Sequence, residues 1–142
     1  MMSKPLVVKN EIVIYAPASK VWEVLINPRF IKQWDELPDG YGEENLKLGS
    51  VIEWVGNAVL TVSAFEPCKL LRLSFYQPGW ELPPESYSIA YTCSLSAQND
   101  GSTLFTMEIG DFAQLPDGQP YYEGSIPFGQ IASQRIKELA EQ

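Results

Sequence analysis

Histidine is missing from this 142-residue sequence, and cysteine is scarce. Without an imidazole, Ser–His and Cys–His nucleophile pairs, histidine bases and histidine-containing metal sites are excluded. Cys68 and Cys93 are the only two thiols. They are too few for a four-thiolate zinc site, and their spacing matches no short redox motif. We therefore expect no metal and no cofactor. We interpret both cysteines as small apolar side chains in a free-thiol protein, with a single disulfide as the alternative.

Positive charge is also in short supply. Lys and Arg number 10 against 18 Asp and Glu, which gives a formal net charge of −8. Nucleic acids and anionic membranes both attract basic surfaces, so we expect neither as a partner. No apolar run approaches the roughly 18 residues that span a bilayer. The N-terminal residues turn polar too soon for a signal peptide. The sequence predicts an acidic, soluble and cytoplasmic protein.

The composition is that of an ordinary globular domain. Apolar residues make up 45% of the chain and charged residues 20%, close to the averages for folded domains. We find no internal repeat, no low-complexity segment and no linker rich in Pro, Gly or Ser. Residues 1–142 are therefore expected to form a single domain.

The N-terminal part predicts one strand and two short helices. Residues 10–15 are rich in β-branched side chains, which is typical of a strand. Apolar positions at i, i+3 and i+4 within residues 21–25 indicate a helix. Asn27-Pro28 ends this helix and begins a second one over residues 28–35, because the residue before a proline avoids the helical region. Trp34 lies at the end of the second helix.

Strand-like segments fill most of the rest. Residues 99–101 predict a three-residue hairpin loop with Gly101 left-handed. That loop places every large apolar residue of its hairpin on one face, by pairing Leu95 with Phe105, Cys93 with Met107 and Tyr91 with Ile109. The expected strands span residues 51–55, 58–65, 70–77, 87–97 and 103–112.

A long helix ends the chain. Residues 125–142 carry an apolar stripe that includes Phe128 and Ala132. An earlier start near Gln119, with a kink over residues 124–127, is the alternative. The element order predicts an α+β domain of the helix-grip type, in which a curved antiparallel sheet of about six strands wraps around the long C-terminal helix. Two short helices follow the first strand.

Five landmarks carry a family resemblance. They are EIVIYAPASKVWEVL at residues 11–25, NPRFIKQWD at 27–35, LGS at 48–50, FEPCKL at 65–70 and GSTLFT at 101–106. In this order the chain resembles the SRPBCC or START-like superfamily, and most closely the branch named for the activator of the heat-shock-protein-90 ATPase. The resemblance covers residues 9–141 and implies a deep cavity for a lipid, sterol, aromatic polyketide or hormone. Some members of the superfamily only bind such molecules, whereas others cyclise or hydrolyse them.

The expected cavity lies between the sheet and the last helix. By the resemblance, Trp34 matches a family position that points inward. Asp35, next to it, is either a residue of the cavity mouth or a carboxylate at a helix end. A tyrosine on an apolar wall orients a small ligand through its hydroxyl. The lining residues that we predict on the strand and helix faces are Tyr91, Met107, Ile109, Phe128 and Ala132.

Two strand registers compete beside this cavity. A two-residue turn at Gly56-Asn57 pairs Glu53 with Leu60, and then Glu53 faces the concave side while Trp54 faces outward. A shift by one residue reverses both side chains and makes Trp54 a wall of the cavity. A buried Glu53 would be a candidate acid or base, and Asp111, expected at the concave rim, is another weak candidate.

Three functions fit these features. The first is a carrier or sensor that binds a small apolar molecule and catalyses no reaction. The second is a cyclase- or hydrolase-type enzyme that uses cavity tyrosines and carboxylates. The third is a co-chaperone-like module that binds a protein partner through an exposed patch. An exposed edge strand near residues 51–55 also leaves a homodimer open.

Overall fold

One antiparallel sheet and three α-helices make up the fold of the residues that the structure describes. The computed structural model describes residues 5–35, 37–38, 40–54, 58–77 and 88–142. The sheet has six strands in the order β1-β6-β5-β4-β3-β2, so the last five strands form a meander and β1 adds to β6. The elements are, in chain order, β1 (Val8–Ile14), α1 (Ala18–Ile26), α2 (Pro28–Trp34), β2 (Val51–Glu53), β3 (Val59–Glu66), β4 (Leu70–Tyr76), β5 (Ala90–Ala97), β6 (Thr103–Gly110), η3 (Phe112–Gln114) and α3 (Gly118–Ala140).

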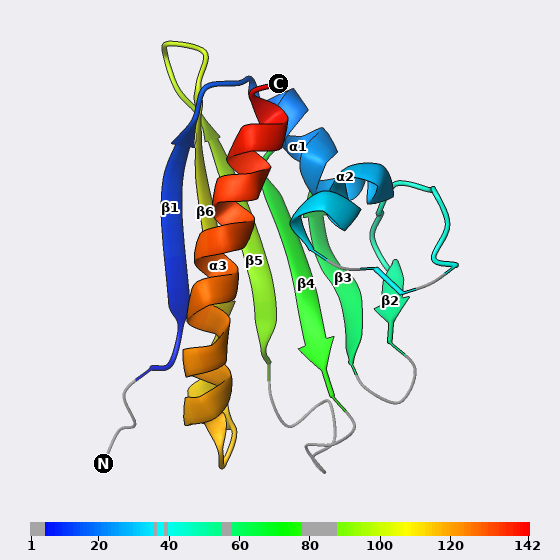
Figure 1. Cartoon of the computed structure of the whole chain (residues 1–142), viewed down its shortest axis with the longest axis vertical. Coiled ribbons are helices and arrows are strands. Elements are labelled where there is room, and N and C mark those ends of the chain that lie inside the picture. Colours follow the sequence, from blue (N-terminus) through cyan, green and yellow to red (C-terminus); the bar gives the residue numbers. More distant parts are fainter. Residues whose placement is uncertain (1–4, 36, 39, 55–57, 78–87) are drawn as a thin grey trace.

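All three α-helices lie on one face of the sheet (Figure 1). The long helix α3 runs along the strands over the β1 side, whereas α1 and α2 lie beside its C-terminal part. This arrangement is the helix-grip α+β fold that the sequence predicts. Among the described residues, no helix combines the length and the apolar character that crossing a membrane requires.

Asn27 joins the first two helices as predicted. Its backbone N–H donates to the carbonyl of Glu23 and closes α1, while its side-chain oxygen accepts from the N–H of Arg29, 3.0 Å away, and opens α2. Pro28 stands at the first position of α2, where its missing N–H leaves no donor unpaired. The short connection brings the apolar faces of both helices onto the same core.

The β5–β6 hairpin has the predicted register. Tyr91 lies opposite Ile109, and the two pairs farther along the hairpin match as well. Gly101 has a φ of 89°, the left-handed conformation that the three-residue loop needs. Turn chemistry and side-chain alternation agree here, so the register follows from the sequence.

The β2–β3 register is the shifted one of our two alternatives. Glu53 pairs with Val59 and Ile52 with Leu60, so the pairing of Glu53 with Leu60 is wrong. The Trp54 N–H donates to the carbonyl of Ala58, so three residues separate the two. The predicted two-residue turn at residues 56–57 itself falls outside the described residues.

The β3–β4 turn also differs from the prediction. Glu66 pairs with Leu70, so the turn holds three residues and not the two expected at Pro67-Cys68. The register shifts back between Val62 and Ala64 at an irregularity in β3, and beyond it Val62 faces Leu73 as predicted. A β-bulge of this kind inserts one unpaired residue and so corrects a register.

The last helix begins before residue 119 and continues through Pro127, as in the longer of the two predicted forms. It approaches β1 closely at Gly129. A Cβ on Gly129 would stand 2.3 Å from Nδ2 of Asn10 and 3.2 Å from Cγ1 of Val8. With Asn10 in its present place, an alanine at residue 129 would force a shift, so glycine suits this close approach of α3 to β1.

Candidate ligand-binding site

A row of aromatic rings joins the sheet to α3. Phe75 of β4 stacks on Tyr91 of β5 with ring centroids 5.9 Å apart and planes inclined at 29°. Tyr91 stacks in turn on Phe128 of α3, with centroids 5.8 Å apart and the same inclination. All three residues are partly exposed. The row is thus an accessible apolar surface between the sheet and the helix.

Alternation along the strands places the rings on this side. Phe75 shares the inward face of β4 with Leu73, and Tyr91 shares that of β5 with Cys93. Tyr91 and Phe128 are predicted ligand residues, and the structure brings them together. Phe75 is a site residue that our sequence reasoning missed, although its place in the alternation indicated its face.

Tyr91 is the polar group of the row. Burial raises the pKa of its phenol well above the ordinary value, and the nearby Asp35 carboxylate adds to the rise. The hydroxyl therefore stays protonated and donates or accepts hydrogen bonds without ionising. Asp35 ends α2, where its N–H donates to the carbonyl of Ile31. The electrostatic environment at this end of the row disfavours additional negative charge.

Trp34 is fixed by a hydrogen bond inside the helical layer. Its indole N–H donates to the carbonyl of Val24, 2.9 Å away, and the residue is only 6% exposed. An indole held in this way ties α2 to α1 and positions Asp35, the next residue. Sequence reasoning found the burial of Trp34 but not its hydrogen-bond partner.

Three other predicted lining residues are tightly packed. Met107 is 1% exposed, and Ile109 and Ala132 are both 0% exposed. A side chain without accessible surface adjoins no space that holds a water molecule. These residues belong to the packed core, and a ligand would reach them only if neighbouring side chains moved. Trp54, by contrast, is partly exposed and packs against the core on the same side as Ile52.

The two carboxylates that we considered for acid–base chemistry lie apart from the row. Glu53 is exposed on β2 and points away from the core. Asp111 precedes η3, and its Oδ1 accepts the N–H groups of Leu6 (2.9 Å) and Ala113 (2.8 Å). The Asp111 carboxylate thus caps η3 and holds the segment before β1.

Surface hollows lie beside α2 and the segment that follows it, where sequence reasoning placed none. One hollow, of about 370 Å³, includes Arg29, Lys32 and Glu43 in its lining. A neighbouring hollow of about 480 Å³ shares Lys32 and Glu43 and adds Tyr41. Charged side chains give these hollows a polar character that differs from the aromatic row. In the part of the chain that the structure describes, no group of three Cys, Asp or Glu residues is placed to hold a metal ion.

Solved structures share this fold over nearly the whole chain. A Mesorhizobium loti protein, MLL2253, has a TM-score of 0.68 and 24% identity, and the match covers 94% of this chain and 95% of that one. The Aha1 dimer from Colwellia psychrerythraea has a TM-score of 0.71 and 15% identity, with coverages of 95% and 96%. CalU16 from Micromonospora echinospora has a TM-score of 0.58 and 20% identity, with coverages of 99% and 94%.

No protein-family model matches the sequence. Comparison with curated proteins yields no relative either. The likeness therefore rests on structure, and identities this low establish the fold without the function. By that likeness the chain has a helix-grip fold and is similar in structure to Aha1.

Proposed function

We propose that this protein binds a small apolar or amphipathic molecule between the sheet and α3, as a carrier or sensor. The observation that carries the proposal is the partly exposed row Phe75–Tyr91–Phe128. Three stacked rings offer a large apolar surface of fixed orientation, and Tyr91 adds one hydroxyl to it. Such a combination suits a ligand with a flat apolar body and a polar end.

The ligand is neutral under this proposal. Asp35 already raises the pKa of the Tyr91 phenol by its negative charge, so a carboxylate placed at the same end would be repelled. A hydroxyl on the ligand would instead share a hydrogen bond with Tyr91. Hydroxylated aromatic molecules therefore fit the site better than fatty acids or aromatic acids.

The acid–base alternative receives no support from its candidate residues. Glu53 lies exposed at the sheet edge, and Asp111 is engaged by two backbone N–H groups. Neither of them belongs to the aromatic row. A binding role needs only the row and its hydroxyl.

A matched pair of probes tests the proposal. We expect 2-naphthol to bind in isothermal titration calorimetry, and 2-naphthoate, its carboxylate counterpart, to bind more weakly. Phe128→Ala should weaken 2-naphthol binding by about tenfold, since loss of a ring contact and its buried area costs roughly 1.4 kcal/mol. Tyr91→Phe should reduce the preference for the hydroxylated probe, because the rings remain and the hydroxyl is lost.

Phe30→Ala is the control variant. Phe30 is also a partly exposed ring, but it lies on the helical layer, with the cations of Lys20 and Arg29 5.0 and 5.2 Å from the centre of its ring. Its loss should leave 2-naphthol binding unchanged. Absence of binding by both probes, or an equal effect of Phe30→Ala and Phe128→Ala, would refute the proposal.

A further inference from the structure

Along its outer side, the edge strand β1 pairs with no other strand of the described residues. The N–H and carbonyl of Leu6 bond to Asp111 and Phe112, on the β6 side of the strand. Backbone groups alternate in direction along an edge strand, so those of Lys9, Glu11 and Val13 point away from the sheet. A row of this kind is a template for another strand.

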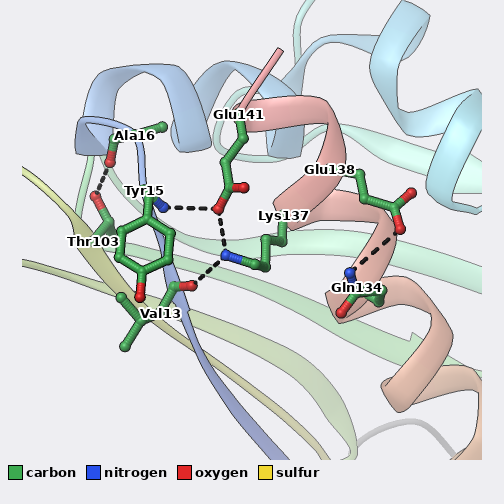
Figure 2. A network of polar contacts seen from close by, with 8 residues as sticks. All are labelled: Val13, Tyr15, Ala16, Thr103, Gln134, Lys137, Glu138 and Glu141. Carbon is green, nitrogen blue, oxygen red and sulfur yellow. Dashed lines mark hydrogen bonds and ion pairs between the residues drawn. The ribbon is translucent and has the colours of Figure 1, made fainter.

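Lys137 of α3 and Glu141, the residue that caps α3, occupy the end of that row (Figure 2). The Lys137 ammonium donates to the carbonyl of Val13, 3.0 Å away, and pairs with the Glu141 carboxylate. The same Glu141 oxygen accepts the N–H of Tyr15 at 2.9 Å. The ion pair thus bonds the edge through one donor and one acceptor, as a neighbouring strand would.

The ion pair is partly shielded from solvent. The side chains of Lys137 and Glu141 are only 20% and 29% exposed. The ammonium of Lys137 also lies 4.4 Å from the centre of the Tyr15 ring, which is a cation–π contact. These contacts among Val13, Tyr15, Lys137 and Glu141 therefore link the C-terminal end of α3 to the edge of β1.

The exposed side chains of β1 are complementary to themselves. If a second β1 is placed antiparallel and centred on Asn10, Lys9 of each copy lies opposite Glu11 of the other. Both residues are exposed on the outer face, and facing opposite charges stabilise a strand pair. The same register brings Val13 opposite Val7 of the second copy, so a full ladder needs the Val13 carbonyl that Lys137 occupies.

We propose that the free edge of β1 is a pairing surface for a second copy of this chain, and that the Lys137–Glu141 contact keeps this surface closed. A twofold-symmetric pair has a Val13 at each end and therefore two such contacts to release. While both contacts are formed, only the central Lys9 and Glu11 positions are free. A strand pair that short is only marginally stable, so the chain is a monomer until the Lys137–Glu141 contact with the edge is broken.

The test removes the contact and leaves the helix intact. Lys137→Ala/Glu141→Ala should convert a monomer into a dimer whose population rises with concentration in sedimentation velocity. Gln134→Ala/Glu138→Ala removes another i,i+4 pair of α3, joined at 3.3 Å, which lies away from the edge in Figure 2. This control should stay monomeric.

Charge exchange on β1 then tests the register. Added to the opened variant, Lys9→Glu should restore the monomer, because Glu would face Glu11 of the second copy. Lys9→Glu/Glu11→Lys should bring the dimer back, because the facing charges are opposite again. A dimeric wild-type chain, an opened variant that stays monomeric, or a dimer that tolerates Lys9→Glu would each overturn the proposal.

Discussion

Gly129 lies where α3 packs closely against Asn10 of β1, and a substitution there tests how close the two elements are. In a helix interior, Gly→Ala normally stabilises by roughly 1 kcal/mol, because alanine loses less backbone entropy on folding. At Gly129 the added Cβ would meet Nδ2 of Asn10 at 2.3 Å. Overpacking of this kind costs roughly 1–3 kcal/mol. We therefore expect Gly129→Ala to lower the free energy of unfolding by up to about 2 kcal/mol.

Gly124→Ala is the matched control on the same helix. A Cβ at Gly124 would meet no atom within 4 Å. This variant should gain the roughly 1 kcal/mol of helix propensity, which corresponds to a rise of about 3 °C in Tm for a chain of this size. The two substitutions are chemically identical, so a difference in sign isolates the contact with β1.

Removing the amide of Asn10 should reverse the effect. In the Asn10→Ala background the near contact at 2.3 Å is gone, and Gly129→Ala should become stabilising by roughly 1 kcal/mol. No described residue accepts a hydrogen bond from the buried Nδ2 of Asn10, so its loss leaves no partner unpaired. Guanidinium unfolding followed by tryptophan fluorescence gives the free energies of unfolding of the wild type, the two single variants and the double variant. Stabilisation of the wild-type chain by Gly129→Ala, equal to that by Gly124→Ala, would contradict this prediction. It would mean that α3 does not contact Asn10 as closely as the structure shows.

Three further predictions concern single side chains. Trp34→Phe should lower the free energy of unfolding by roughly 1–3 kcal/mol, because it leaves the buried carbonyl of Val24 without its donor; chemical denaturation measures this loss. Burial raises the pKa of the Cys93 thiol to about 12, so iodoacetamide near pH 8 should modify the partly exposed Cys68 in the native protein and spare Cys93, as peptide mass mapping would reveal. The raised pKa of Tyr91 means that above about pH 10 the unfolded chain releases a proton that the folded chain keeps, so stability should fall as pH rises there and fall less steeply in Tyr91→Phe.

Some of the fold follows from the sequence because independent signals agree. In the β5–β6 hairpin, the loop at residues 99–101 and the alternation of Tyr91 and Cys93 give the same register, and the structure has it. At β2–β3 the strand is too short for its side-chain alternation to fix the register. The two alternative registers differed only in the assumed length of the turn. The β-bulge near Ser63 shifts the alternation of β3, so that Phe65 follows Leu60 and Val62 on the core side; strict alternation along β3 could not predict this.

The site was predicted less completely than the fold. Tyr91 and Phe128 were placed correctly on facing surfaces, since each lies on an apolar stripe of its own element. The inclusion of Phe75 in the row depends on how far β4 extends beside β5. The structural bonds of Asp111 depend on a segment 105 residues away in the chain, and no local pattern indicates such a partner.

The most direct measurement is a chemical-shift titration of the isotope-labelled protein with 2-naphthol. We predict that intermolecular nuclear Overhauser effects connect the probe to the rings of Phe75, Tyr91 and Phe128, and that these contacts weaken in Phe128→Ala. Contacts at the polar hollows beside α2, or no saturable shift anywhere in the protein, would contradict binding at the aromatic row.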